Sequence, residues 1–177
     1  RGYAELVARR PDAPPLVWIG AALPVHREYE RKCLEVLRPL LDAGKAHHLG
    51  QVPHADVLAL TASAHTIVYP STCEDCPNVV LEALGVGAVL VCADIPANRE
   101  LADDQAVMID RPTGASVAAA LERALFDEAL RAELKVGARQ RAAMFTWDAT
   151  AERFADALRD AFDLRSDREA PVGRERH

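Results

Sequence analysis

Several features that would assign a function directly are missing from this 177-residue sequence. Positive charge is not in excess, because 21 Lys and Arg residues stand against 27 Asp and Glu residues, for a formal net charge of -6. This balance gives no electrostatic reason to bind nucleic acid or an anionic membrane. The longest apolar stretches, such as VVLEALGVGAVLV, are interrupted by Glu and Gly and fall short of the roughly 18 residues that a spanning helix needs. We therefore expect any anionic ligand to be held by local groups.

Cysteine is also scarce, with four residues in the sequence. This number does not make a disulfide framework, and no signal peptide opens the sequence, so we expect a reducing, cytoplasmic location. A structural zinc site needs four ligands, usually in two pairs, whereas the sequence has one C-x-x-C pair, Cys73 to Cys76. We therefore predict no metal site. A metal or redox site at this pair remains the alternative to two loop residues without special chemistry.

Half of the residues are apolar, and they fall into short runs that alternate with helical patterns. This alternation predicts an α/β fold: a Rossmann-like parallel sheet with helices on both faces. Strands are expected at residues 15–21, 46–49, 65–69, 88–92 and 106–109, and helices at 2–10, 27–43, 55–63, 78–86, 115–126, 128–143 and 147–164. Pro39 is expected to kink or split the second helix. One domain is expected over residues 1–164, followed by a disordered polar tail at 165–177.

Two glutamates lie close to the expected start of the helix at residue 78. Pro77 suits the first helical position, so the backbone N–H groups of residues 78–80 have no intrahelical partner and form an anion site. Glu82 lies one turn further along the same face, where its ionised carboxylate can accept from two ribose hydroxyls. Glu74 lies in the loop above a strand's carboxyl end. Taken singly, Glu82 is also explained as a core carboxylate bonded to backbone N–H groups, and Glu74 as a solvated loop charge.

The segment YPSTCEDCPNVVLEALGVGAVLVCADIPANREL resembles the donor-binding segment of family 4 (group 1) retaining glycosyltransferases. These enzymes have the GT-B fold of two Rossmann-like domains. In that family a strand ending near Pro-Ser is followed by Glu, seven residues and a second Glu-Ala, and then by a Val-rich strand and an Asp-Ile-Pro-like loop. Glu74 and Glu82 fall on this spacing. The similarity continues upstream through HHLGQVPHADVLALTASAHTIVYPS and downstream to FTWDATAERFADAL.

The resemblance implies the C-terminal, donor-binding half of a GT-B enzyme that transfers a sugar with retention and without a metal ion or cofactor. It implies that Glu82 holds the ribose hydroxyls of a nucleotide-diphosphate sugar. The backbone N–H groups of Asn78 and Val79 would hold the diphosphate, and Arg1 would add positive charge beside it. Glu74 would contact the transferred sugar as the catalytic residue.

The resemblance also implies that the loop Gly50-Gln51-Val52 lies near the nucleotide base through backbone contacts. Family members have an N-terminal acceptor domain, and the second domain begins with Arg and then Lys-Gly. Here Arg1-Gly2 matches only the Lys-Gly half, so we expect this sequence to lack the acceptor domain and the first strand. Such a half should bind donor without turnover, and the missing domain could attach the enzyme to the inner membrane.

The alternatives are a GT-B sugar-nucleotide epimerase and a non-enzymatic α/β domain with a C-x-x-C metal or redox site.

Overall fold

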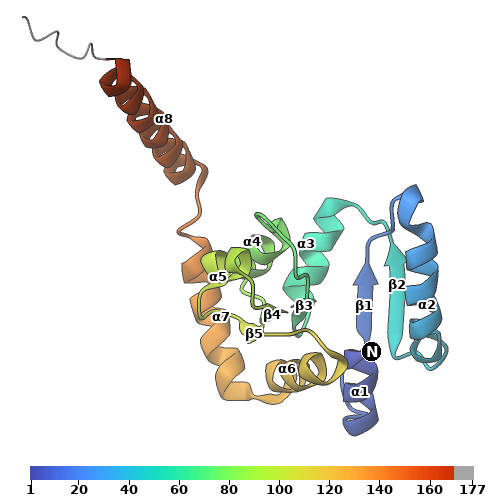
Figure 1. The fold of residues 1–177 in the computed structure, drawn as a ribbon. Helices are drawn as coiled ribbons and strands as arrows, with labels where there is room; N and C mark the ends of the chain where they lie inside the picture. Colours follow the sequence, from blue (N-terminus) through green and yellow to red (C-terminus); the bar gives the residue numbers. More distant parts are fainter. Residues whose placement is uncertain (170–177) are drawn as a thin grey trace, which may run out of the picture. The chain divides into compact units, whose positions relative to one another are not determined.

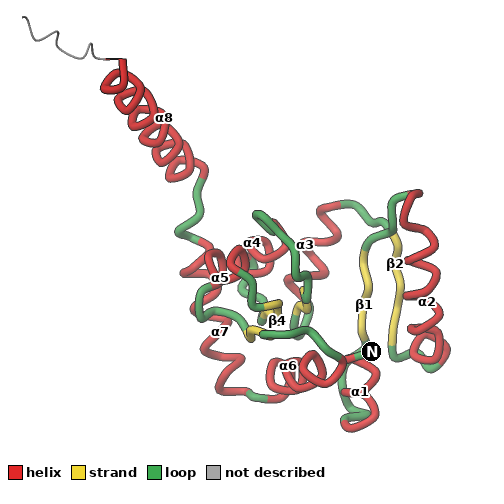
Figure 2. Tube along the Cα trace, in the orientation of Figure 1, coloured by secondary structure: helices red, strands yellow, loops and turns green. Residues whose placement is uncertain are grey.

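The structure, a computed structural model, describes the backbone of residues 1–169 and the side chains of residues 1–162. The elements in chain order are α1 (Gly2–Arg9), β1 (Leu16–Ile19), the 3₁₀ helix η1 (Pro24–His26), α2 (Arg27–Asp42), β2 (Ala46–Gly50), α3 (His54–Ser63), β3 (Ile67–Tyr69), α4 (Asn78–Gly85), β4 (Leu90–Ala93), α5 (Pro96–Ala102), β5 (Val107–Ile109), α6 (Gly114–Phe126), α7 (Glu128–Ala142) and α8 (Trp147–Glu169) (Figures 1 and 2). Helices and strands alternate as the sequence predicts.

The chain divides into two compact units. The first is Arg1–Ala142, which contains every strand of the described residues, and the second begins at Ala143 and contains α8. The start of α8 is capped by Thr146, whose Oγ1 accepts a hydrogen bond of 3.1 Å from the N–H of Ala149. This helix continues to Glu169, five residues beyond its expected end at 164. The rest of the expected disordered tail, residues 170–177, lies outside the described residues.

Pairing between neighbouring strands is parallel throughout the described chain. β1 pairs with β2, and β4 lies between β3 and β5. The predicted parallel α/β class is confirmed, but the strands form two sheets instead of the single sheet expected. In a doubly wound sheet of strand order 3-2-1-4-5-6, the strand between these two groups would be the first of the domain.

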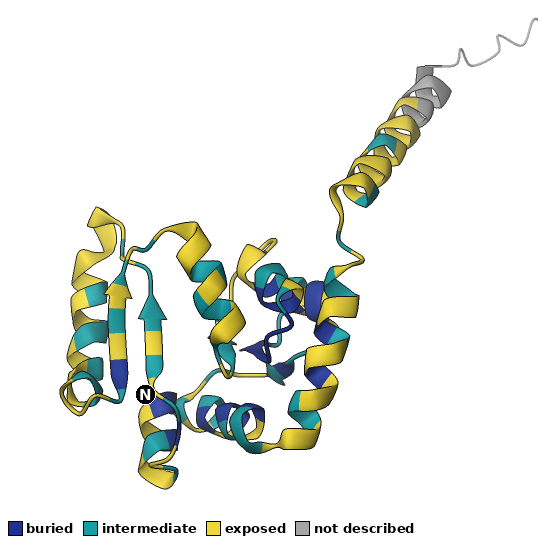
Figure 3. Ribbon diagram, turned by 180° about the vertical axis from the view of Figure 1, so that it is seen from behind, coloured by how far each residue is buried: buried dark blue, intermediate teal, exposed yellow. Residues whose placement is uncertain are grey.

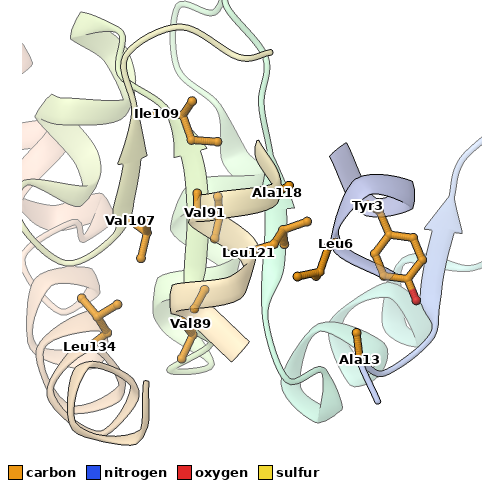
Figure 4. Packing of buried hydrophobic residues seen from close by; sticks show 12 residues of the cluster. Tyr3, Leu6, Ala13, Val89, Val91, Val107, Ile109, Ala118, Leu121 and Leu134 are labelled. Carbon is orange, nitrogen blue, oxygen red and sulfur yellow. The ribbon is translucent and has the colours of Figure 1, made fainter. Parts of the chain in front are cut away.

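The main core surrounds the three-stranded sheet. In Figure 1, α4 lies above these strands and α6 below them, so both faces are covered. All four residues of β4 are buried, as expected for a central strand of a parallel sheet. Figure 4 shows Leu6 of α1 beside Leu121 of α6, with Val91 of β4 in the same cluster. This packing fixes the strands and helices from which the site is built.

One helix was not predicted and one local expectation is wrong. Asp94 and Ile95 form the expected loop after β4, but the chain then enters α5, which starts with Pro96 at its first position, where a missing N–H costs nothing. Asn98 of α5 is fully buried, and its Nδ2 donates to the carbonyl of Ala93 at 2.7 Å, which ties the helix to the end of β4. Pro39 does not split α2, which is one continuous helix over Arg27–Asp42 with this residue in its last turn.

Candidate active site

The candidate site lies where β2 and β3 end. After β2 the chain turns through Gly50 into α3, and after β3 it passes through residues 70–77 into α4. Both loops therefore follow the carboxyl ends of strands that pair in parallel with a neighbour. The helices α3 and α4, into which the loops lead, pack against one another. Ligands of open α/β sheets bind at this edge. The fold therefore brings most of the predicted donor-binding residues to the edge where binding is expected.

Glu82 lies on the partly open side of α4. The buried face of this helix is formed by Val80, Ala83 and Leu84, whereas the Glu82 side chain keeps 30% of its surface exposed. Its Oε1 lies 3.7 Å from Nε2 of His54, the first residue of α3. Glu82 is therefore not the buried core carboxylate of the simpler interpretation. The sequence pattern assigned no role to His54. Its position at a helix start, directly after GQVP, is the signal that could have indicated a place near the site.

The start of α4 is open, with one correction to the predicted anion site. Pro77 is the N-cap and not the first helical residue, and it makes no side-chain capping bond. The N–H of Val80 donates to the carbonyl of Pro77 at 3.0 Å, so it is already used within the turn. The first two residues of the helix, Asn78 and Val79, are exposed. Their N–H groups remain the candidate donors at the positive end of the helix dipole.

Glu74 is held by its neighbours and is not a freely solvated loop charge. Its side chain is half-buried, and Oε1 accepts a hydrogen bond from the phenol of Tyr69 at the end of β3. Hydrogen bonds from Ser71 and from Tyr69 lower the pKa of Glu74, against an opposing effect of desolvation. Burial and the neighbouring Glu74 carboxylate raise the pKa of Tyr69 to about 12. The carboxylate is thus ionised at neutral pH and points in a fixed direction, and the tyrosine five residues earlier was the missed partner.

The remaining predicted residues lie in two different places. Gly50 ends β2 with a positive φ of 64°, and its carbonyl accepts from the N–H of Gly20 at 2.7 Å. Gln51 is exposed and Val52 is half-buried, in the turn that leads from β2 into α3. Arg1 lies at the start of α1, beside the first turn of α6 and not in the loop that carries Glu74, because Gly2 packs closely against that turn. The roles of these residues stay predictions.

Cys73 and Cys76 are exposed free thiols on either side of Glu74. Among the described residues, no group of three or more His, Cys, Asp or Glu side chains has a geometry that could hold a metal ion. Within the same residues, none of the helices combines the length and apolar character needed to cross a bilayer. The expectation that Cys73 and Cys76 bind no metal stays a prediction.

Comparison with known proteins identifies the family. The model of the family "Glycosyl transferases group 1" matches residues 4–141. The chain belongs to this family. It is 30% identical over 105 residues to the O-antigen chain mannosyltransferase B of Escherichia coli, covering 59% of this chain and 28% of that protein. It is 29% identical over 168 residues to a D-inositol 3-phosphate glycosyltransferase of Corynebacterium diphtheriae, covering 91% of this chain and 38% of that protein.

Solved structures share the fold of this group 1 chain. The Anabaena protein HepE in complex with UDP superposes with a TM-score of 0.77 at 20% identity, over 88% of this chain and 43% of that one. Sucrose-phosphate synthase of Thermosynechococcus elongatus superposes with a TM-score of 0.76 at 20% identity, over 92% of this chain and 42% of that one. The chain thus spans less than half the length of these relatives. It has the Rossmann-like fold of one half of a GT-B glycosyltransferase, and neither alternative function gains support.

Proposed function

We propose that this chain is the donor-binding half of a glycosyltransferase that takes a sugar from a nucleotide-diphosphate sugar. The observation that carries the proposal is the continuous segment from Glu74 to Glu82 at the carboxyl end of β3. It presents an oriented carboxylate, the open start of α4 and a second, partly exposed carboxylate within nine residues. The complexes of HepE with UDP and with UDP-glucose support a nucleotide-sugar as the ligand of this fold.

The proposed binding mode assigns one chemical task to each part of this segment. The N–H groups of Asn78 and Val79 donate to the diphosphate, where the helix dipole favours negative charge. Glu82 accepts from the two ribose hydroxyls, with His54 beside it, because an ionised carboxylate can only accept hydrogen bonds. The backbone of the Gly50 turn lies near the base. Arg1 adds positive charge to the diphosphate in this proposal.

Glu74 is proposed to contact the transferred sugar. Its carboxylate is fixed by Tyr69 at the end of β3, in the loop that precedes the diphosphate site. When the bond to the sugar breaks, negative charge grows on the diphosphate, and the donors at the helix start stabilise that charge without a metal ion. The reaction is proposed to transfer a hexose with retention of configuration, and to need no cofactor. The mannosyltransferase among the relatives supports a hexose.

Turnover is proposed to require a second domain that brings the acceptor. Reacting groups must be held together by both halves of a GT-B enzyme, and loss of one half removes the positioning that makes the reaction unimolecular. This chain alone is therefore expected to bind a donor without transferring its sugar. The location of the enzyme, cytoplasmic or attached to the inner membrane by its other domain, is part of the same proposal.

Replacement of Glu82 by Ala tests the binding mode. The loss of hydrogen bonds to a charged group should weaken UDP binding to this chain by about 1.5–3 kcal/mol, measured by calorimetry. Glu133→Ala is the matched control, because Glu133 is an exposed glutamate on α7, away from the candidate site. Circular dichroism should show both variants folded. Equal UDP affinity of Glu82→Ala and the control would refute the assignment of Glu82 to the ribose.

A further inference from the structure

The C-x-x-C pair is a feature that the proposed function leaves unused. Cys73 and Cys76 enclose Glu74 and Asp75 in the β3–α4 loop. We propose that Cys73 and Cys76 form a reversible disulfide under oxidation, and that this bond displaces Glu74 from its position for the sugar. The site of oxidation is independent of the proposed function, whereas its effect on donor binding rests on that function.

The two loop cysteines differ from the other two in access to an oxidant. Both side chains are exposed, whereas Cys33 in α2 is half-buried and Cys92 in β4 is fully buried. Burial raises the pKa of the Cys92 thiol to about 12, and its sulfur lies against Met108 at 3.5 Å. Because the thiolate is the reactive form, Cys92 is inert. Oxidation should therefore be selective for the loop.

The sequence separation and the loop conformation allow this bond to close. Residues 70–77 belong to no helix or strand, and the chain bends at residues 75 and 76. A disulfide needs Cα atoms about 4.4–6.8 Å apart. Cys73 and Cys76 are residues i and i+3 in the sequence, and a chain that folds into a turn over such a pair brings its Cα atoms to less than about 7 Å. The bond can therefore form with movement of the loop alone.

The oxidation balances with a peroxide as the oxidant. The thiolate of one cysteine attacks the peroxide oxygen, the O–O bond breaks, and a sulfenic acid and hydroxide are formed. The second thiolate attacks that sulfur, the S–S bond forms and a second hydroxide leaves. In sum, two thiols lose two electrons and two protons, and hydrogen peroxide becomes two molecules of water. A dithiol such as dithiothreitol reverses the change by thiol–disulfide exchange.

The disulfide should act on Glu74 more than on the start of α4. Glu74 lies inside the ring that the bond closes, so its backbone must follow the new path of the loop. Its hydrogen bond from Tyr69 depends on the present path. The helix is anchored by the buried Val80 and Leu84, so the N–H groups at its start stay in place. Oxidation should therefore weaken the sugar contact and spare the diphosphate contact.

The first arm of the test measures the bond itself. The purified chain is treated with hydrogen peroxide, remaining thiols are alkylated, and peptides are mapped by mass spectrometry with and without dithiothreitol. A reversible link between Cys73 and Cys76 is expected, and Cys73→Ser or Cys76→Ser should each prevent it. Cys33→Ser is the control and should leave the link unchanged. Recovery of both loop cysteines as free thiols, as sulfinic acids or in bonds between chains would overturn the proposal.

The second arm measures the effect of the disulfide on ligand binding. Calorimetry gives the affinity of the reduced and of the oxidised chain for UDP and for UDP-glucose. Oxidation should weaken UDP-glucose by about tenfold, comparable to a lost hydrogen bond to a charged group, and change UDP by less than about twofold. Cys76→Ser treated with peroxide should bind both ligands as the reduced chain does. Equal affinity of the two redox forms for UDP-glucose would overturn the effect on Glu74. A reduced chain that binds neither nucleotide would refute the proposed function, while the peptide map still decides whether the site exists.

Discussion

The sheet of β3, β4 and β5 and the sheet of β1 and β2 are packed very differently. Every residue of β4 is buried, and α4 has three buried residues. By contrast, Val17 of β1 is 42% exposed, and α2, which packs on β2, has no buried residue. Figure 3 shows dark blue gathered around β4, α4 and α6, whereas β2 and α2 are teal and yellow except for the buried Ala46 at the start of β2.

This difference separates two kinds of binding group. Apart from Arg1 at the start of α1, the groups proposed for the diphosphate, ribose and sugar lie on the well-packed side, on α4 and the loop before it. The turn proposed for the base follows β2 on the lightly packed side and contributes backbone only. Charged contacts gain from a rigid support, since a preorganised group needs no rearrangement when charge develops. The most buried sheet therefore carries the chemistry that needs the most accurate placement.

The largest expected effect is on stability. Leu90→Ala in β4 should lower the free energy of unfolding of the first unit by about 2–5 kcal/mol, because Leu90 is fully buried and its removal leaves a cavity. Val17→Ala in β1 should change it by about 0.5 kcal/mol or less, as at other surface positions. Urea denaturation of both variants measures the contrast. Similar losses in the two variants would show that both sheets contribute equally to one cooperative core.

A second expected effect separates the two sides by function. In the complete two-domain enzyme, Glu74→Gln should lower turnover by about 10- to 100-fold, because it keeps the size of the side chain but removes the charge placed at the sugar. In this chain alone, the same change should alter the dissociation constant of UDP by less than about twofold, since UDP has no sugar to transfer.

The control on the lightly packed side is Gln51→Ala. Gln51 is exposed, and only its backbone is proposed to lie near the base, so UDP affinity should be unchanged. Steady-state kinetics and calorimetry measure the two variants. Turnover near wild type in Glu74→Gln, or loss of UDP binding in the isolated chain, would contradict the role of Glu74 in contacting the sugar.

The sequence predicted strands on both sides of the molecule, with bounds within two residues of those observed. Continuous apolar runs such as AVLVC arise from burial on both faces, so periodicity located β4. It did not predict α5, because a short helix that depends on Asn98 bonding to the end of β4 has a weak local signal. Spacing placed Glu74 and Glu82, but their partners Tyr69 and His54 depend on tertiary approach. The division into two sheets likewise depends on which strand edges meet.

The smallest expected effect concerns how the loop on the well-packed side holds its carboxylate. Two hydrogen bonds lower the pKa of Glu74, the one from Ser71 having the larger effect and the one from Tyr69 the smaller. Tyr69→Phe removes the second bond, so the pKa of Glu74 should rise toward its ordinary value of about 4.3. NMR titration of the carboxyl carbon measures the change. Tyr29→Phe is the matched control on the lightly packed side, because Tyr29 is 72% exposed in α2, and it should leave the pKa of Glu74 unaltered.

The same hydrogen bond sets the direction of a pH dependence. A carboxylate whose pKa is lowered by folding stabilises the folded state fully above the unfolded pKa, and this contribution is lost as the pH falls through the folded pKa. The stability difference between wild type and Tyr69→Phe should therefore be constant at neutral pH and shrink as the pH falls below about 4.3. Urea denaturation at pH 7 and at successively lower pH measures it. A difference that persists unchanged at the lowest pH would mean that the phenol stabilises the loop by packing, and that its hydrogen bond to Glu74 contributes nothing.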